Sequence, residues 1–305
     1  MQKLGLVRDL PDEEYHKILP PEEAFYSSSQ FKDAVEDIEH FHKKYVSREV
    51  STAVGSQTQS NFDVGSLYHC MVLEPHKVKD TFVIFKGAVK RGKAYEEFVA
   101  DNKDKIIVSQ KQYDTAASIA KAAGENQSCQ NLLAQGEPEL SLFVELHGLR
   151  IKVRADFIDF ERGFILDMKS TTGNPKNAND IQKKVSNLNY DLSAALYLDA
   201  FNEYCRLNDL PPIKHFMWCF DSKDKLTSKV WTCSEEMIKV GRAKYMQGLN
   251  AIRRAQKKGW AFPDENTMIG PATWDAQLWI GKDDKKAVEE IVDMEIIEQE
   301  GEDLL

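Results

Sequence analysis

Several features that define whole classes of protein are missing from this sequence. No stretch of 18 or more residues is apolar throughout, so we expect no membrane-spanning helix and no membrane partner. The opening residues, MQKLGLVRDLPDEEYHK, are acidic and contain no apolar segment, so we expect no secretory signal. The sequence also shows no internal repeat.

The cysteines are few and scattered. There are five of them, and none belongs to a CxxC pair: Cys70, Cys129, Cys205, Cys219 and Cys233. An odd number at wide spacing indicates reduced thiols rather than a disulfide framework, a zinc site or an iron–sulfur cluster. We therefore expect a cytoplasmic protein.

Basic residues are not in excess, because the formal net charge is −9. The acids are concentrated late in the chain, where residues 289–303 hold eight acids and no base. Without these eight, 41 acids remain against 40 bases, so the body of the chain is nearly neutral and has room for a local basic groove. We interpret residues 283–305 as an acidic tail, either a disordered solubilising end or a short helix that docks on a partner or a neighbouring subunit.

The remaining sequence is ordinary for a globular protein, with 305 residues in all and 42% of them apolar. We interpret residues 1–282 as a single domain with a helical N-terminal elaboration and a core over about 60–260. Helices are predicted from about residue 29 through residue 41, over 64–73, from 109 onward with a Ser109–Gln112 capping box, over 177–208 as one helix or a pair, and over 234–258. Strands are predicted over 80–85, 140–146, 149–160, 164–169, 213–221 and 226–233. This order predicts an α/β fold with a mixed β-sheet flanked by helices on both faces.

Two of the predicted strands, LRIKVRADFID and FILDMK, carry charged residues in alternation with apolar ones, and a tight turn at Gly163 pairs them as a hairpin. On the first strand, one face holds Ile151, Val153, Ala155 and Phe157, and the other holds Lys152, Arg154 and Asp156. On the second strand, Asp167 and Lys169 share a face opposite Leu166 and Met168. If the polar faces coincide, then Asp156, Asp167 and Lys169 converge.

This arrangement has a specific chemical meaning. Two facing carboxylates repel each other, and a divalent cation removes the conflict. Mg²⁺ favours one or two carboxylates together with phosphate oxygens, and a neighbouring lysine can stabilise charge on a phosphate. The pattern therefore predicts metal-assisted phosphodiester hydrolysis. The alternative is a solvated strand edge, because D-x-K is a common sequence.

The hairpin segment ADFIDFERGFILDMK resembles the PD-(D/E)XK nuclease signature, with Ala155 in place of the usual proline. More specifically, the chain resembles the RecE-type exonucleases (exonuclease VIII nuclease domain) of bacteria and their phages. Further motifs carry this resemblance in order along residues 13–197: EEYHK with SSSQFKD, GSLYHCMVLEP, KRGKAYEEFVADNKDKIIVSQKQYDTAASIAKA and GEPELSLF. The resemblance implies a restriction-endonuclease-like core.

The resemblance also implies a role for each matching residue. Asp156, Asp167, Glu139 and His69 would be metal ligands, with the backbone carbonyl of Met168 as a further contact. Lys169 would be the catalytic lysine, and the cofactor would be Mg²⁺, with Mn²⁺ able to substitute. Without the resemblance, His69 reads as a helix histidine packed beside Tyr68, and Glu139 as a solvated acid.

Eight residues are interpreted as DNA-binding: Arg91, Lys93, Lys152, Arg154, Ser170, Thr171, Ser193 and Tyr197. Arg91 and Lys93 belong to a basic cluster that could track phosphates or be a solvated loop. The Ser170–Thr171–Thr172 run could contact phosphates or cap the next helix. Tyr197 matches the tyrosine of a Q-x-x-x-Y motif, but Ser193 stands where that motif has glutamine.

The resemblance finally implies an activity and its partners. The enzyme would digest linear double-stranded DNA in the 5′→3′ direction and leave 3′ single strands for recombination. It would form a ring-shaped homo-oligomer and work with a RecT-type single-strand annealing protein. Two alternatives stay open: a single-strand or structure-specific nuclease of the same superfamily, and a non-catalytic DNA-binding module on this scaffold.

Overall fold

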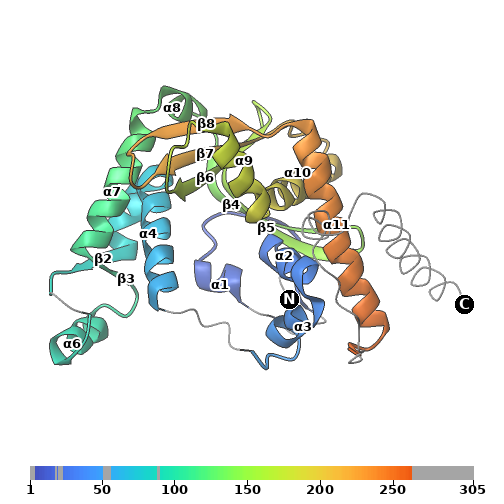
Figure 1. The fold of residues 1–305 in the computed structure, drawn as a ribbon, viewed down its shortest axis with the longest axis horizontal. Coiled ribbons are helices and arrows are strands. Elements are labelled where there is room, and N and C mark those ends of the chain that lie inside the picture. The colour runs from blue at the N-terminus through green and yellow to red at the C-terminus, as the bar shows by residue number, and fades with distance from the viewer. Residues whose placement is uncertain (1–3, 18, 20–22, 51–55, 88–89, 263–305) are drawn as a thin grey trace, which may run out of the picture. The chain divides into compact units, whose positions relative to one another are not determined.

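A six-stranded mixed sheet forms the centre of the computed structural model (Figure 1), which describes residues 4–17, 19, 23–50, 56–87 and 90–262. Its strands, in spatial order, are β1 (Gly5–Val7), β4 (Glu137–Leu146), β5 (Leu149–Asp159), β6 (Phe164–Thr171), β7 (His215–Ser222) and β8 (Ser228–Thr232). Neighbouring strands run antiparallel except β6 and β7, which are parallel. Two helices, α9 (Ala178–Asn187) and α10 (Tyr190–Leu207), make the crossover that this parallel pair requires.

Helices cover both faces of the sheet, which confirms the predicted α/β architecture (Figure 1). One face packs against α2 (Ser28–Glu36), α10 and α11 (Glu235–Lys257), and its core includes Leu142, Val153 and Ile165. The other face packs against α4 (Ser56–Leu73) and α7 (Gln110–Glu125), and its core includes Leu166 and Met168. The two apolar cores hold β6 between them, so its backbone is buried on both sides.

The remaining elements are short and lie around this layered core. They are α1 (Asp12–His16), α3 (Ile38–Tyr45), a 3₁₀ turn (Pro75–Lys77), α5 (Val78–Thr81), α6 (Lys93–Asp101), α8 (Gln127–Leu133) and a parallel two-stranded sheet of β2 (Phe82–Phe85) and β3 (Ile106–Ser109). Within the described part of the chain, every helix is too short or too polar to cross a membrane.

Local sequence signals explain where several helices begin. Ser109 and Gln112 form the predicted capping box at the start of α7, with the Gln112 side chain accepting the Ser109 N–H at 2.8 Å. Ser234 caps α11 by accepting the N–H of Met237. The segment predicted over 177–208 is a pair of helices, because Asn189 between them adopts a left-handed φ of 49°.

One predicted helix and one predicted strand face are wrong. The helix expected from residue 29 through 41 is two helices, α2 and α3, because Asp37 has extended backbone and its side chain caps α3 at the N–H of His40. Phe157 was expected on the face of Ala155, but it packs in the opposite core with Leu166. The β4–β5 ladder is interrupted at Asp156, and the alternation of the two faces shifts there, because Ala155 and Ile158 both pack in the core opposite Phe157.

The part of the chain that contains the predicted site forms one compact unit that ends at Ala261. The predicted acidic tail of residues 283–305 and the predicted domain end at residue 282 both lie outside the described residues.

Candidate metal centre

The candidate site lies where β5 and β6 part. Their antiparallel ladder has three pairs, and the last joins Phe157 to Leu166. The next pair in the same register would join Asp156 to Asp167. Instead, Asp156 Oδ2 accepts the backbone N–H of Met168 at 2.7 Å. A side-chain carboxylate thus replaces the backbone partner, and the two strands separate at the two acids that the sequence analysis singled out.

Glu139 reaches the same place from β4 through an unusual backbone conformation. It stands opposite Asp156, because Pro138 pairs with Phe157 and Leu140 pairs with Ala155 on either side. Its φ is +47°, in the left-handed region that residues with a side chain seldom adopt. Such conformations cluster at functional sites, where surrounding structure holds them. The turn in the backbone interrupts the ladder and aims the carboxylate toward α4.

His69 of α4 completes a group of three ligand-type side chains. Its Nε2 lies 2.9 Å from the Met168 carbonyl oxygen, which can only accept, so this nitrogen carries a proton. Its Nδ1 lies 3.6 Å from Asp156 Oδ2 and 3.9 Å from Glu139 Oε1. One donor atom from each of the three lies within 4.8 Å of the others. A nitrogen and two carboxylate oxygens at this spacing fit a divalent cation.

Asp167 and Lys169 form an ion pair beside this group. Their side chains share one face of β6, as predicted, and Lys169 Nζ lies 2.7 Å from an Asp167 carboxylate oxygen. The ammonium also lies 5.5 Å from the centre of the Tyr190 ring, which favours a cation. The structure thus brings Asp156, Asp167 and Lys169 together, and the Met168 carbonyl is engaged by His69.

Burial and mutual charge shift the proton affinities at this centre. Burial alone lowers the pKa of His69, but the charges of Asp156 and Glu139 outweigh it and raise that pKa to about 9. Burial, supported by the charge of Asp156 and opposed by Lys169, raises the pKa of Asp167 to about 6. Burial lowers the pKa of Lys169, but the charges of Asp167 and Asp156 raise it above its ordinary value. Lys169 is therefore protonated at neutral pH.

A buried contact that the sequence analysis missed fixes α4 against the sheet. The hydroxyl of Tyr68 donates a hydrogen bond to Asp221 Oδ2 on β7, and both side chains are fully buried. Cys219 Sγ donates to the other oxygen of Asp221. Because Tyr68 precedes His69, this bond helps to set the position of the histidine. No local signal could have found a pair that lies 153 residues apart.

Two predicted DNA-binding residues are engaged by the N-terminal segment. Arg154 bonds to the Asp12 carboxylate, the Leu10 carbonyl at 2.8 Å and Ser141 Oγ at 2.9 Å. Lys152 Nζ donates to the Tyr15 carbonyl at 2.5 Å. Burial and the nearby Arg154 lower the pKa of Lys152 to about 8. Both cations lie on the predicted face of β5, but they face α1.

The other predicted DNA-binding residues lie in three places. Ser170 and Thr171 end β6 directly after Lys169, and Thr171 Oγ1 accepts a hydrogen bond from Lys184 of α9. Ser193 and Tyr197 lie on α10, where burial and the charges of Asp167 and Asp156 raise the pKa of Tyr197. Arg91 and Lys93 are exposed at the start of α6, which Figure 1 shows well away from β6.

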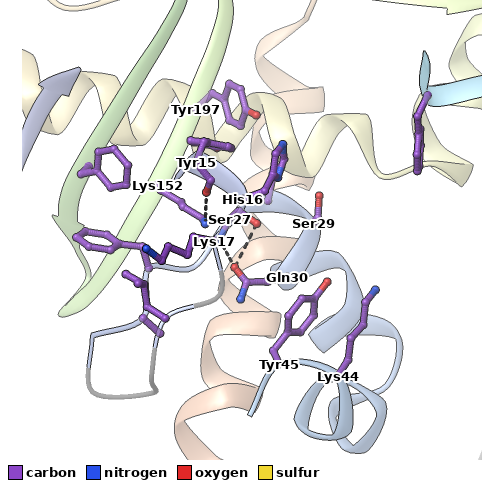
Figure 2. A pocket seen from close by; sticks show the side chains of 16 residues that line it. Tyr15, His16, Lys17, Ser27, Ser29, Gln30, Lys44, Tyr45, Lys152 and Tyr197 are labelled. Carbon is purple, nitrogen blue, oxygen red and sulfur yellow. Dashed lines mark hydrogen bonds between the residues drawn. The ribbon is translucent and has the colours of Figure 1, made fainter. Parts of the chain in front are cut away.

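Two cavities lie near the centre, and Tyr15 lines both of them. The first, of about 600 Å³, is lined by His69, Glu139, Arg154 and residues of the N-terminal segment. The second, of about 530 Å³, is lined by cations and hydroxyl groups together with apolar side chains (Figure 2). Among its lining residues are Lys17, Ser27, Ser29, Lys44, Lys152 and Tyr197. Tyr197 links this second cavity to the centre, because the charges of Asp167 and Asp156 act on its hydroxyl group.

Comparison with known proteins agrees with this fold. A family model described as "PDDEXK-like domain of unknown function (DUF3799)" matches residues 27–266. The crystal structure of a candidate exonuclease from Eubacterium rectale matches in fold with a TM-score of 0.57 at 15% identity, over 90% of this chain and 100% of that one. The structure of SSO0001, at 11% identity over 64% of this chain and 88% of that one, has a TM-score of only 0.27, which is too low to indicate a shared fold. No curated protein matches the sequence. Because the family model spans well over half of the chain, this protein belongs to the family of PDDEXK-like domains of unknown function.

Proposed function

We propose that this protein is a metal-dependent exonuclease that acts on linear double-stranded DNA. The observation that carries the proposal is the convergence of His69, Glu139 and Asp156 within 4.8 Å, beside the Asp167–Lys169 ion pair. The family match supports a PD-(D/E)XK nuclease, and the structural neighbour bears the name of a candidate exonuclease. Retention of both acids and the lysine in one place favours an active enzyme over a silent DNA-binding module.

In the proposed mechanism, His69, Glu139, Asp156 and Asp167 would hold Mg²⁺. When bound, such an ion polarises a phosphoryl oxygen and neutralises the charge that develops on the phosphate. The protein's own groups then have defined roles. Asp156 keeps the strands apart by accepting the Met168 N–H, and the Met168 carbonyl holds the His69 ring in one orientation. Lys169 stays protonated, so it orients water and stabilises the developing negative charge instead of acting as a base.

The finer features of the proposal rest on the sequence motifs that resemble those of RecE-type exonucleases. We propose digestion in the 5′→3′ direction, 3′ single-stranded products for annealing-dependent recombination, and a cytoplasmic location. The same resemblance favours assembly into a ring-shaped homo-oligomer and a RecT-type annealing protein as the partner. The predicted DNA contacts at Ser170, Thr171, Ser193 and Tyr197 are part of the same proposal. Ser170 and Thr171 follow Lys169 on β6, and Ser193 lies one turn before Tyr197 on α10.

A digestion experiment tests the proposal. The protein is incubated with linear and with covalently closed circular duplex DNA, each with Mg²⁺, with Mn²⁺ or with EDTA. We expect loss of linear DNA alone, in either metal, and no loss in EDTA. Degradation of the circles would show that the protein is an endonuclease and not an exonuclease. Intact DNA under all conditions would favour a non-catalytic binding module.

A further inference from the structure

A groove rimmed by lysines lies beside the first half of α4, on the side of β3 and the first turn of α7. Its volume is about 760 Å³. Among the described residues that line it are four lysines and a single carboxylate: Lys90, Lys105, Lys111, Lys223 and Asp63. The carboxylate of Asp63 accepts hydrogen bonds from Gln59 at 2.9 Å and Gln112 at 3.4 Å. We call this feature the lysine groove, and its charge favours an anion.

The lysine groove also has an apolar component. Val64 is buried, and Ile106, Ile107 and Tyr95 are half-buried along its lining. Lys90 and Lys111, by contrast, are exposed. The Tyr95 ring is supported by an edge contact with Phe85, at 5.0 Å between ring centres. The lining therefore contains apolar and aromatic surface as well as exposed cations.

Two short routes through the backbone connect the lysine groove to the metal centre, one across a hydrogen bond and one along α4. The backbone N–H of Lys223 donates to the Thr171 carbonyl at 2.8 Å, and Thr171 follows Lys169 by two residues, or roughly 7 Å of strand. On α4, Val64 precedes His69 by five residues, or roughly 7.5 Å of helix. Lys184 also reaches Thr171, through its Oγ1, so cations continue from Lys169 toward the groove. Burial and the charge of Lys184 lower the pKa of Lys223, a conflict that a bound anion would relieve.

We propose that the lysine groove binds single-stranded DNA next to the metal centre, an inference that rests on the proposed nuclease function. Proteins that bind single strands combine a basic groove for the phosphates with aromatic or apolar surface for the unstacked bases. A duplex hides its bases, so it would leave the apolar lining of Val64, Ile106 and Tyr95 unused. The strand that the nuclease leaves uncut is the natural occupant.

Binding measurements on a cleavage-deficient protein test the inference. In a Lys169→Ala background, affinity for a labelled oligothymidylate is measured by fluorescence anisotropy across a series of salt concentrations. The variant Lys111→Ala/Lys223→Ala is compared with Lys239→Ala/Lys257→Ala, two exposed lysines of α11 on the opposite face of the sheet. Loss of two phosphate contacts lowers the slope of log affinity against log salt by about 1.4, which corresponds to an affinity loss of about 25-fold near 0.1 M salt. Thermal unfolding of both variants checks that they are folded.

The possible outcomes separate the inference from the proposed function. The lysine groove is supported if the Lys111/Lys223 pair loses affinity for the single strand, the α11 pair does not, and affinity for blunt duplex falls less. Equal losses in the two pairs, or a larger loss for duplex, would overturn it. If the groove variants lose single-strand affinity while the wild-type protein cuts no DNA, the nuclease proposal fails and the groove stands as a binding site.

Discussion

Binding of a divalent cation to this protein should expel about one proton from His69. The charges of Asp156 and Glu139 raise the pKa of this imidazole to about 9, so about 99% of it is protonated at pH 7. A histidine binds metal only when neutral, so the ion must displace that proton. The competition weakens binding at pH 7 by about 100-fold relative to pH values above 9, or about 3 kcal/mol. Affinity should therefore rise about tenfold per pH unit between pH 7 and pH 8.

Isothermal titration calorimetry measures this proton directly. Titrations with Mn²⁺ at pH 7, in two buffers with different ionisation enthalpies, give the number of protons released. We expect about one for the wild-type protein and for His40→Asn, an exposed histidine of α3, and close to none for His69→Asn. Asp167, whose pKa is about 6, adds only about a tenth of a proton. Equal affinity and no proton release in all three proteins would show that His69 is not a ligand.

Two further predictions concern stability. Ionisation of Asp167, with its pKa raised to about 6, costs the folded protein up to about 3 kcal/mol above pH 6 and nothing below about pH 4. Without divalent cations, Asp167→Asn should therefore have the same free energy of unfolding in urea as the wild type at pH 4, and a higher one at pH 7. A variant that becomes less stable relative to the wild type as the pH rises would refute this. Tyr68→Phe should lower the free energy of unfolding by about 1–3 kcal/mol, because Asp221 loses a buried partner. Calorimetric melting should show a fall of a few degrees, and an unchanged midpoint would mean that this bond contributes nothing.

The hairpin could be predicted from the sequence because its signals are local. Alternation places Asp167 and Lys169 on one face of β6, and Gly163 marks the turn. The separation of β5 and β6 could not be predicted in this way. It depends on Asp156 taking the Met168 N–H and on the left-handed backbone of Glu139, and neither leaves a periodic trace. The misplaced face of Phe157 has the same origin.

Contacts between distant segments were equally hidden. The sequence predicted Lys152 and Arg154 on the polar face of β5, and they lie there. Their side chains, however, bond to Tyr15 and Asp12 of the N-terminal segment, which the sequence did not predict. The bond from Tyr68 to Asp221 joins α4 to β7, which lie 153 residues apart in sequence at these positions. Ordered motifs along the chain supplied the candidate ligands His69 and Glu139, which no single segment could bring together.

The most direct test of the proposed centre is the rate at which Lys169→Met cleaves linear duplex DNA in a single turnover with Mg²⁺. The matched control is Lys239→Met, an exposed lysine of α11. Loss of a cation that stabilises developing charge should slow cleavage by about 100- to 1,000-fold, with DNA affinity retained and the control unchanged. Cleavage by Lys169→Met at the wild-type rate would show that the phosphodiester is hydrolysed elsewhere in the protein.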